Sequence, residues 1–334
     1  MTGSAIAGSG PLVTVVTPVY NGAPYLRQCV ESVLQQSYRN IEYVIVDNHS
    51  TDDSRVIAES LAADDDRVHV RSTETHLPMM ENWNFALSFL ATESKYCKVV
   101  HADDWIKPTC IEKMVDLAER HPSVGLVGAY RLEEDRPSLR GIAPGQEMMA
   151  GRRAGADTLR GRLSVFGSPT QLLIRADLIR GQRAFYDESM VHADKDACLR
   201  SLIQSDFGFV SEILTYTRRH NESKSSAVYA LDPRRVEDLR LLKRYGEHYL
   251  GEDFPVEWES AVAGYHRYLA RRLLNGSGID FWRFQRRGLE GIGVRISYRL
   301  LAWELFLQLA NLTDTARRLN ARLKRAIRHE GRAG

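Results

Sequence analysis

The sequence has 334 residues, of which 43% are hydrophobic and 26% charged, as in ordinary globular proteins. This composition excludes a fibrous or wholly disordered chain, and the length predicts about one to three domains. The formal net charge of +2 hides an asymmetry, because residues 281–334 contain 12 Lys/Arg and 4 Asp/Glu while the remainder is mildly acidic. A basic tail favours a polyanionic partner, either a membrane or a nucleic acid.

The first half of the chain alternates apolar, β-branched segments with amphipathic ones. The expected strands are 12–19, 41–46, 68–71, 96–101 and 125–130, and the expected helices are 23–36, 54–62, 82–90 and 108–120. This alternation predicts an α/β fold with a parallel sheet covered by helices on both faces. Ligands bind at the carboxyl ends of the strands in such sheets, so residues that follow each strand are the candidate site.

The second half is less regular. Residues 131–161 are rich in Gly, Pro and Arg and are predicted to form a mobile loop. Further strands are expected at 168–174 and 208–217, with a helix at 193–205, and the pattern is almost wholly helical from about residue 229. We therefore expect a disordered N-terminus at 1–11, an α/β domain at 12–228 and a C-terminal helical region at 229–334.

The cellular location is indicated by what the sequence lacks. The four cysteines have no C-x-x-C spacing, which favours a reducing cytoplasm over disulfides. The first ten residues have neither the basic nor the apolar region of a signal peptide. No run of about 18 apolar residues occurs, so we expect no membrane-spanning helix.

Two adjacent acids, Asp103 and Asp104, follow the strand at 96–101. Neighbouring carboxylates repel each other unless a cation lies between or beyond them. Mg²⁺ and Mn²⁺ prefer oxygen ligands and leave coordination positions for substrate phosphates. A solvated loop or a cap for the next helix is the alternative, and the pair alone does not decide between these interpretations.

Two other strand ends are also polar. The first is Thr17-Pro18-Val19-Tyr20-Asn21-Gly22, where Tyr20 offers an aromatic face to a nucleobase and Asn21 offers amide donors. The second begins at Asp47, which can accept hydrogen bonds from a base or ribose. Neither the G-x-G-x-x-G fingerprint of dinucleotide folds nor a P-loop is present.

These three strand ends, in this order, resemble those of the family 2 glycosyltransferases, which have the GT-A fold. The matching segments are Val15–Gly22, Val44–Asp52 and His101–Pro108, and the resemblance covers residues 12 to 226. It implies transfer of a sugar, with inversion, from a nucleotide-diphosphate donor to a hydroxyl of a glycan or lipid-linked acceptor. A UDP-sugar is the favoured donor, and the expected setting is the synthesis of bacterial cell-surface polysaccharide or glycolipid.

The resemblance also implies roles for single residues. The nucleotide-binding residues would be Thr17, Pro18, Tyr20, Asn21, Asp47, Ser50, Asn82 and Asp103. Asp104 would bind Mn²⁺ or Mg²⁺, with His220 completing the metal shell, and Arg218 or Arg219 would contact the diphosphate. His101 stands where the family often has Asp, and it has no assigned role.

The family supplies a carboxylate base on a later helix, and Asp194 matches it. The base deprotonates the acceptor hydroxyl, which then attacks the anomeric carbon. Asp196 is a weaker candidate because it points to a different face of the helix. Ala193 replaces a Glu that is frequent in the family, and the alternative role of Asp194 is to stabilise the helix dipole.

The C-terminal tail is apolar from Leu289 to Leu312 and becomes a basic amphipathic pattern from Asn311 to Arg328. This pattern is typical of a helix lying in a membrane interface, which would place the protein on the inner face of the cell membrane. A helical bundle or a homo-oligomer interface is the alternative.

Two other classes of protein are disfavoured. A nucleotidyltransferase needs a phosphate loop rich in Gly, Arg and Lys after the first strand, and Pro18–Gly22 is not one. A nucleic-acid-binding protein is disfavoured because no binding motif is present and aromatic residues do not interleave with the Arg cluster of the tail. A catalytically silent GT-A-like binding protein stays open because of Ala193.

Overall fold

The computed structural model describes residues 10–133, 136–138, 142–143, 145–164, 166, 168–218 and 231–310. The chain forms two compact units, Met1–Ser223 and Lys224–Gly334. The predicted domain boundary at 228/229 lies outside the described residues, as do residues 1–9 of the predicted disordered N-terminus. Gly10, which also belongs to that predicted segment, is described: its carbonyl oxygen accepts a hydrogen bond of 2.8 Å from Asn40 Nδ2.

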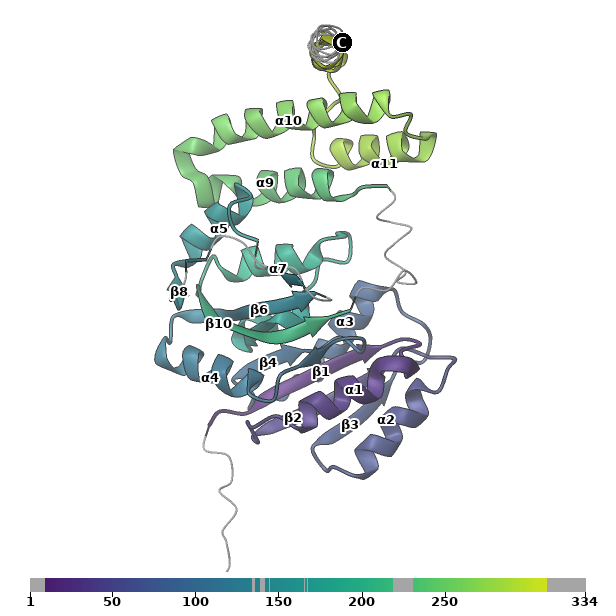
Figure 1. Cartoon of the computed structure of the whole chain (residues 1–334), viewed down its shortest axis with the longest axis vertical. Coiled ribbons are helices and arrows are strands. Elements are labelled where there is room, and N and C mark those ends of the chain that lie inside the picture. Colours follow the sequence, from purple (N-terminus) through teal and green to yellow (C-terminus); the bar gives the residue numbers. More distant parts are fainter. Residues whose placement is uncertain are drawn as a thin grey trace, which may run out of the picture. The chain divides into compact units, whose positions relative to one another are not determined.

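One sheet forms the centre of the first unit (Figure 1), with the strand order β3-β2-β1-β4-β9-β6-β10-β5, while β7 pairs with β6 and β8 with β10. The strands are β1 (Val13–Val19), β2 (Ile41–Asp47), β3 (Val68–Ser72), β4 (Tyr96–Val99), β5 (Trp105–Ile106), β6 (Val124–Glu133), β7 (Arg136–Ser138), β8 (Met148–Met149), β9 (Leu172–Arg175) and β10 (Asp206–Thr217). Strands β3, β2, β1 and β4 are parallel, as are β6 and β10, whereas β9 is antiparallel to both of its neighbours. The predicted α/β fold with a mostly parallel sheet is confirmed.

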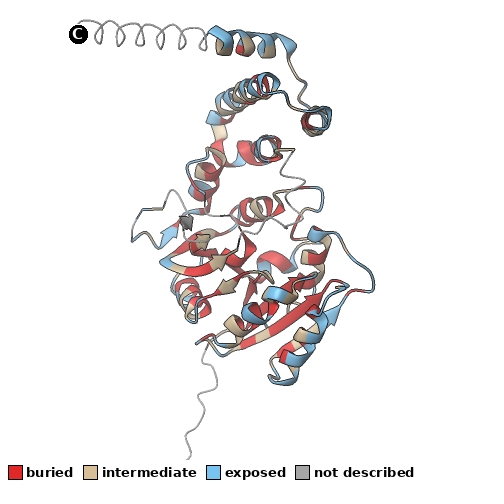
Figure 2. Cartoon of the chain, turned by 45° about the vertical axis from the view of Figure 1, so that its right-hand side comes forward, coloured by how far each residue is buried: buried red, intermediate tan, exposed pale blue. Residues whose placement is uncertain are grey.

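Helices cover both faces of this sheet. They are α1 (Ala23–Leu34), α2 (Ser54–Ala63), α3 (Met79–Leu87), α4 (Cys110–Arg120), α5 (Gly151–Leu159), α6 (Asp177–Arg180) and α7 (Ala193–Ser201). One apolar cluster joins α1, α2 and α4 to alternate residues of β1 and β2, while α3 contacts the sheet at β1 and β2 and α7 contacts it at β6. Every residue of β1 is buried, as a strand covered on both faces requires (Figure 2).

The prediction that residues 131–161 form a mobile loop is wrong. Strand β6 extends to Glu133, and α5 occupies Gly151–Leu159. Glycine suggested a loop, but here it permits close packing: a Cβ on Gly151 would lie 2.0 Å from the carbonyl oxygen of Ser205. The backbone N–H of Gly151 also donates to Asp206 Oδ1 at 2.8 Å, so the start of α5 is tied to the start of β10.

The second unit is helical throughout its described part, as predicted. It contains α9 (Arg234–Leu250), a 3-10 turn η2 (Gly251–Asp253), α10 (Phe254–Leu274), α11 (Ile279–Glu290) and a further helix at 298–310. Its apolar core joins Val236 and Leu239 of α9, Tyr265 and Leu269 of α10, and Phe281 and Leu289 of α11. Within the described ranges, no helix is both long enough and apolar enough to cross a membrane. The predicted amphipathic helix at 311–328 lies outside them.

Two glycine substitutions test the packing of α5. Gly151→Ala should lower the free energy of unfolding by about 1–3 kcal/mol, because its methyl group collides with backbone rather than with a movable side chain. Gly264→Ala, in the interior of α10 with no atom within 4 Å of the added carbon, should raise it by about 0.5–1 kcal/mol. Thermal unfolding of the two variants measures both changes, and equal melting temperatures would contradict the packing described.

Candidate functional site

The strand register brings the three polar strand ends together. Strand β1 pairs in parallel with both β2 and β4, so the residues after these strands emerge at the same edge of the sheet. Antiparallel pairing of Trp105 with Tyr216 places the end of β10 beside the acidic motif as well. The site therefore collects residues from four strand ends that are far apart in the sequence.

The loops after β1 and β2 are joined by hydrogen bonds. The backbone N–H of Asn21 donates to Ser50 Oγ at 3.0 Å, and the N–H of Thr51 donates to Asn21 Oδ1 at 2.8 Å. Asn21 and His49 both have positive φ, at 50° and 59°, which allows the two sharp turns. The predicted nucleotide residues Asn21 and Ser50 thus also fix the positions of these two loops relative to each other.

The other predicted nucleotide residues divide into two groups. Asp47 is buried and receives the N–H of Ser50, and Asn82 is buried with no hydrogen-bond partner for its Oδ1 among the described residues. Tyr20 lies edge-on to His76 with 4.3 Å between the ring centroids. By contrast, Thr17 is fully buried and its hydroxyl points into the core, 2.8 Å from the hydroxyl of Tyr43, so this side chain does not face the edge of the sheet. Pro18 is a buried β1 residue that pairs with Val46.

His101, Asp103 and Asp104 lie close together, with one possible ligand atom of each within 4.8 Å of the others. Asp104 is only 2% exposed, and its Oδ2 accepts a hydrogen bond of 3.4 Å from the Thr217 hydroxyl. Burial, together with the charge of Asp103, raises the pKa of Asp104 to about 7. This carboxylate is therefore placed where its negative charge is poorly stabilised by the protein alone.

Two buried ligand atoms of this cluster have no hydrogen-bond partner within the described part of the chain, namely Asp104 Oδ1 and His101 Nε2. Burial lowers the pKa of His101, which favours the neutral imidazole that binds metals. Carboxylate oxygens together with one imidazole suit Mn²⁺ better than Mg²⁺. The residues present thus fit a divalent cation, with His101 as an additional ligand candidate, whereas His220 lies outside the described residues.

Arg218, the first residue after β10, is held between aromatic rings. Its guanidinium lies 4.6 Å from the ring centroid of Tyr25 and 4.8 Å from that of Trp105, and it donates to Gln28. Trp105 in turn stacks on Tyr216 at 4.9 Å. These contacts anchor the chain beside Asp104 at the point where it leaves β10. Arg219, the other predicted diphosphate ligand, lies outside the described residues.

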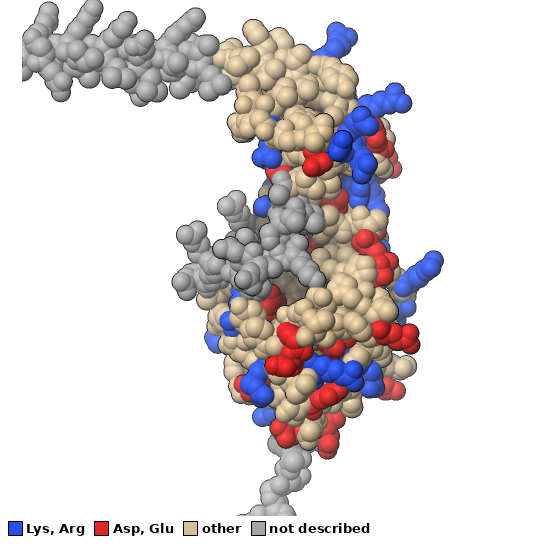
Figure 3. All heavy atoms as spheres, turned by 90° about the vertical axis from the view of Figure 1, so that its right-hand side faces the viewer, with Lys and Arg blue, Asp and Glu red and all other residues tan. Residues whose placement is uncertain are grey.

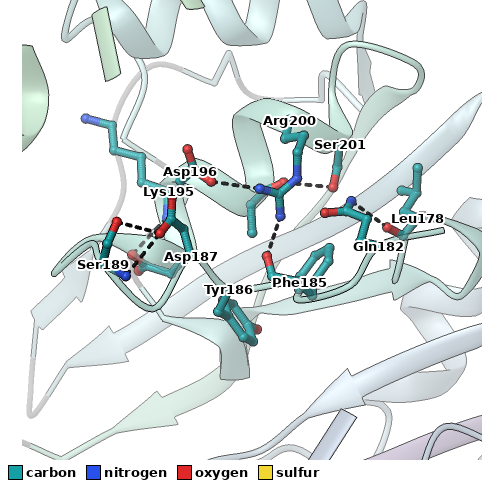
Figure 4. A network of polar contacts seen from close by, with 12 residues as sticks. Leu178, Gln182, Phe185, Tyr186, Asp187, Ser189, Lys195, Asp196, Arg200 and Ser201 are labelled. Atoms are coloured by element: carbon teal, nitrogen blue, oxygen red, sulfur yellow. Dashed lines mark hydrogen bonds and ion pairs between the residues drawn. The ribbon is translucent and has the colours of Figure 1, made fainter. Parts of the chain in front are cut away.

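The two acids of α7 have different environments. Asp196 is fully buried and forms a 2.9 Å ion pair with Arg200, which also donates to the carbonyl of Phe185 (Figure 4). Asp194 is half-buried in the first turn, where its Oδ1 accepts the N–H of Lys195 at 2.8 Å. Burial raises the pKa of Asp194, a direction that suits a group that accepts a proton. Asp196 is thus engaged in an ion pair, and the assignment of the base to Asp194 stays a prediction.

Side chains of α3 connect the acidic motif to the segment that precedes α7. The ring of Trp83 lies 4.6 Å from that of His101 and 5.2 Å from that of Tyr186. The amide of Asn84 binds both backbone groups of Tyr186, accepting from its N–H at 2.9 Å and donating to its carbonyl at 2.8 Å. Sequence reasoning missed the role of Asn84, because its partner Tyr186 lies about a hundred residues further along the chain.

Lys98 and Thr170 form a second support that sequence reasoning missed. Lys98 is fully buried in β4, and its ammonium donates to the carbonyl oxygens of Thr170 and Leu172. The Thr170 hydroxyl accepts the backbone N–H of His101 at 3.0 Å. Lys98 thus holds the turn at Pro169–Gln171 against the end of the strand that carries the acids. A lysine inside an otherwise apolar strand was the one available signal.

The chain matches the model of a known family, Glycosyl transferase family 2, over residues 14–181. It is 28% identical to the glycosyltransferase GlyG of Streptococcus pneumoniae over 64% of this chain and 72% of GlyG. It is also 31% identical to the putative teichuronic acid biosynthesis glycosyltransferase TuaG of Bacillus subtilis, over 46% of this chain and 61% of TuaG.

Solved structures share the fold. A fragment of Staphylococcus aureus TarS superposes with a TM-score of 0.64 at 16% identity, covering 84% of this chain and 79% of the fragment. The same fragment solved with UDP-GlcNAc gives a TM-score of 0.56 at 17% identity, over 76% of this chain and 80% of the fragment. The mannosyltransferase PcManGT of Pyrobaculum calidifontis, in complex with GDP-Man and Mn²⁺, gives 0.51 at 15% identity over 93% and 87% of the two chains.

The first unit therefore has the GT-A fold predicted from the sequence, and the polar edge at β1, β2 and β4 is the edge to which that prediction assigned the substrate. Because the family model spans half of the chain, from the strand that opens the sheet to the helix after β9, the chain belongs to glycosyl transferase family 2 and is a glycosyltransferase.

Proposed function

We propose that this enzyme transfers a sugar from a nucleoside-diphosphate donor, preferentially a UDP-sugar, to a hydroxyl of a glycan or lipid-linked acceptor. The transfer proceeds by a single displacement with inversion. One observation carries the proposal: the polar ends of β1, β2 and β4 meet at a buried acid, Asp104, whose Oδ1 has no partner among the described residues. Such an edge suits a ligand that combines a base, a ribose and a diphosphate.

In this proposal the nucleotide lies along the strand ends. Asp47 and the amide oxygen of Asn82, which has no partner in the described part of the chain, are acceptors for base or ribose donors, and Tyr20 offers its ring to the base. Asp103 would contact the ribose, whereas Asp104 and His101 would hold a divalent cation, with Mn²⁺ preferred to Mg²⁺. When bound, the cation would offset negative charge on the leaving diphosphate. Arg218 or Arg219 would contact the diphosphate, and His220 would complete the metal shell.

Asp194 serves as the base in this scheme. Its raised pKa follows from burial, and in the first turn of α7 its Oδ1 atom accepts the N–H of Lys195. As the acceptor hydroxyl attacks the anomeric carbon from the face opposite the leaving group, its proton passes to Asp194. Attack from the opposite face gives inversion. Trp83 and Asn84 keep the segment before α7 aligned with the acidic motif.

The relatives support the proposed setting. The name of TuaG places that protein in teichuronic acid synthesis, and TarS and PcManGT have been solved with UDP-GlcNAc and with GDP-Man and Mn²⁺. We infer that this chain acts in bacterial cell-surface polysaccharide or glycolipid synthesis. A lipid-linked acceptor would be met at the inner membrane face, where residues 311–328 are the predicted anchor.

A donor screen that measures nucleoside diphosphate release, with and without Mn²⁺, tests the central step. We expect release from a UDP-sugar only with the cation. Asp104→Asn should lower the Mn²⁺-dependent affinity for UDP by about tenfold or more, because a neutral amide replaces a charged ligand. Asp116→Asn, an exposed acid on α4, is the control. If Asp104→Asn binds UDP with unchanged metal dependence, the assignment of the metal site is wrong.

The pKa of Asp104 predicts a pH-dependent stability in the metal-free protein. Because burial raises this pKa from 3.8 to about 7, the native state binds the proton more tightly than the unfolded state does. The contribution of the protonated carboxyl to stability is therefore present at pH 4 and is lost as the pH rises through 7. In EDTA, Asp104→Asn should gain melting temperature relative to wild type between pH 5 and 8. A difference that does not change with pH would contradict the shift.

Replacing the base should separate catalysis from donor binding. Asp194→Asn should lower kcat by about 10²–10⁴-fold, because the amide cannot accept the proton, while UDP affinity stays near that of wild type. Asp196→Asn should instead lower the melting temperature, since it breaks a buried ion pair with Arg200. If Asp194→Asn keeps its turnover rate, the base lies elsewhere, and an anomeric proton coupling that shows retention would exclude the single displacement.

A further inference from the structure

The helix at residues 298–310 presents an apolar, largely aromatic surface to solvent. Tyr298, Trp303, Phe306 and Leu309 are 79%, 58%, 60% and 46% exposed, and we call these four side chains the aromatic face. The rings of Trp303 and Phe306 lie close to parallel, with 5.9 Å between their centroids. Large apolar side chains that gather on one helix face mark an interaction surface, in contrast to single exposed ones.

Two polar residues of the same helix, Glu304 and Gln308, point toward α10. Glu304 is 8% exposed and pairs with Arg267 of α10 at 3.2 Å, and Gln308 donates to the carbonyl of Arg267 at 2.9 Å. Just before the helix, the N–H of Ser297 donates to Nε2 of the buried His266 at 2.9 Å. A helix on the surface of a protein surrounded only by water would instead bury its apolar side chains and expose its polar ones. Contacts with α10 therefore fix the aromatic face outward.

The charge of this region indicates what covers the face. Residues 271–334 contain 14 Lys/Arg and five Asp/Glu, and Arg295 and Arg299, next to and within the helix, are exposed. Figure 3 shows Lys and Arg along one border of an area of uncharged side chains on the C-terminal unit. A second copy would bring like charges together, whereas the headgroups of anionic phospholipids complement them. Tyr, Trp and Phe are also the side chains that favour the interfacial layer of a bilayer.

We propose that the aromatic face inserts into the interfacial layer of an anionic phospholipid bilayer, with the helix at 298–310 lying parallel to the membrane surface. This surface precedes the predicted anchor at 311–328 and involves different side chains. It requires neither a lipid-linked acceptor nor glycosyl transfer. Its failure therefore leaves the proposed function standing, and failure of the proposed function leaves this surface standing.

Fluorescence quenching by brominated lipid distinguishes insertion from surface attraction. The full chain is mixed with vesicles of phosphatidylglycerol and brominated phosphatidylcholine, and the quenched fraction of tryptophan emission is compared with that of Trp303→Phe. We expect wild type to be quenched and Trp303→Phe to lose most of the quenching while still floating with the vesicles. Equal quenching of the two proteins, or none in either, would overturn the proposal.

A charge-inserting variant tests the binding energy. Phe306→Glu/Leu309→Glu should weaken flotation with anionic vesicles by about tenfold or more, because two apolar side chains that insert into the bilayer are replaced by charged ones. Val56→Glu, at a residue of α2 that is 65% exposed, is the matched control and should float like wild type. Unchanged flotation of the double variant contradicts the proposal. A lipid-free dimer that the double variant converts to a monomer would assign the face to a second copy instead.

Discussion

Parallel pairing of β1 with β2 on one side and β4 on the other is the constraint on which the catalytic unit depends. It forces three loops from separate parts of the sequence to emerge at one edge, where they either find ligands or leave polar groups buried without partners. The second outcome is seen at Asn82, His101 and Asp104, each of which has a buried atom without a hydrogen-bond partner within the described ranges. The protein carries this cost in its free state, and the proposed nucleotide and cation would give these atoms partners when bound.

Other contacts within the first unit hold this edge of the sheet in place. Lys98 and Thr170 hold the end of β4, the hydrogen bonds of Asn21 and Ser50 join the first two loops, and the stack of Arg218 on Trp105 fixes the end of β10. Trp83 and Asn84 connect this edge of the sheet to the segment before Asp194. Catalysis by positioning requires such rigid support, because a displacement of about 1 Å can cost two orders of magnitude in rate.

The sequence predicted the features that depend on local pattern. The strand–helix alternation located the sheet, and the motif at Asp103 and Asp104 located the acidic edge. Pattern reasoning failed where the decisive partner is distant in sequence. Gly151 and its neighbours suggested a loop because the backbone of Ser205, which gives the glycine its reason, could not be foreseen. Likewise, His101 had no assigned role until folding placed its ring beside Trp83 and next to the two acids.

The most direct test of the account is a crystal structure of the protein with UDP and Mn²⁺, with anomalous diffraction recorded at the manganese absorption edge. We expect one strong anomalous peak within coordination distance of Asp104, in contact with the diphosphate, and the uracil beside Asp47. UDP bound at this edge without an anomalous peak near Asp104, or bound away from the ends of β1, β2 and β4, would contradict the central claim.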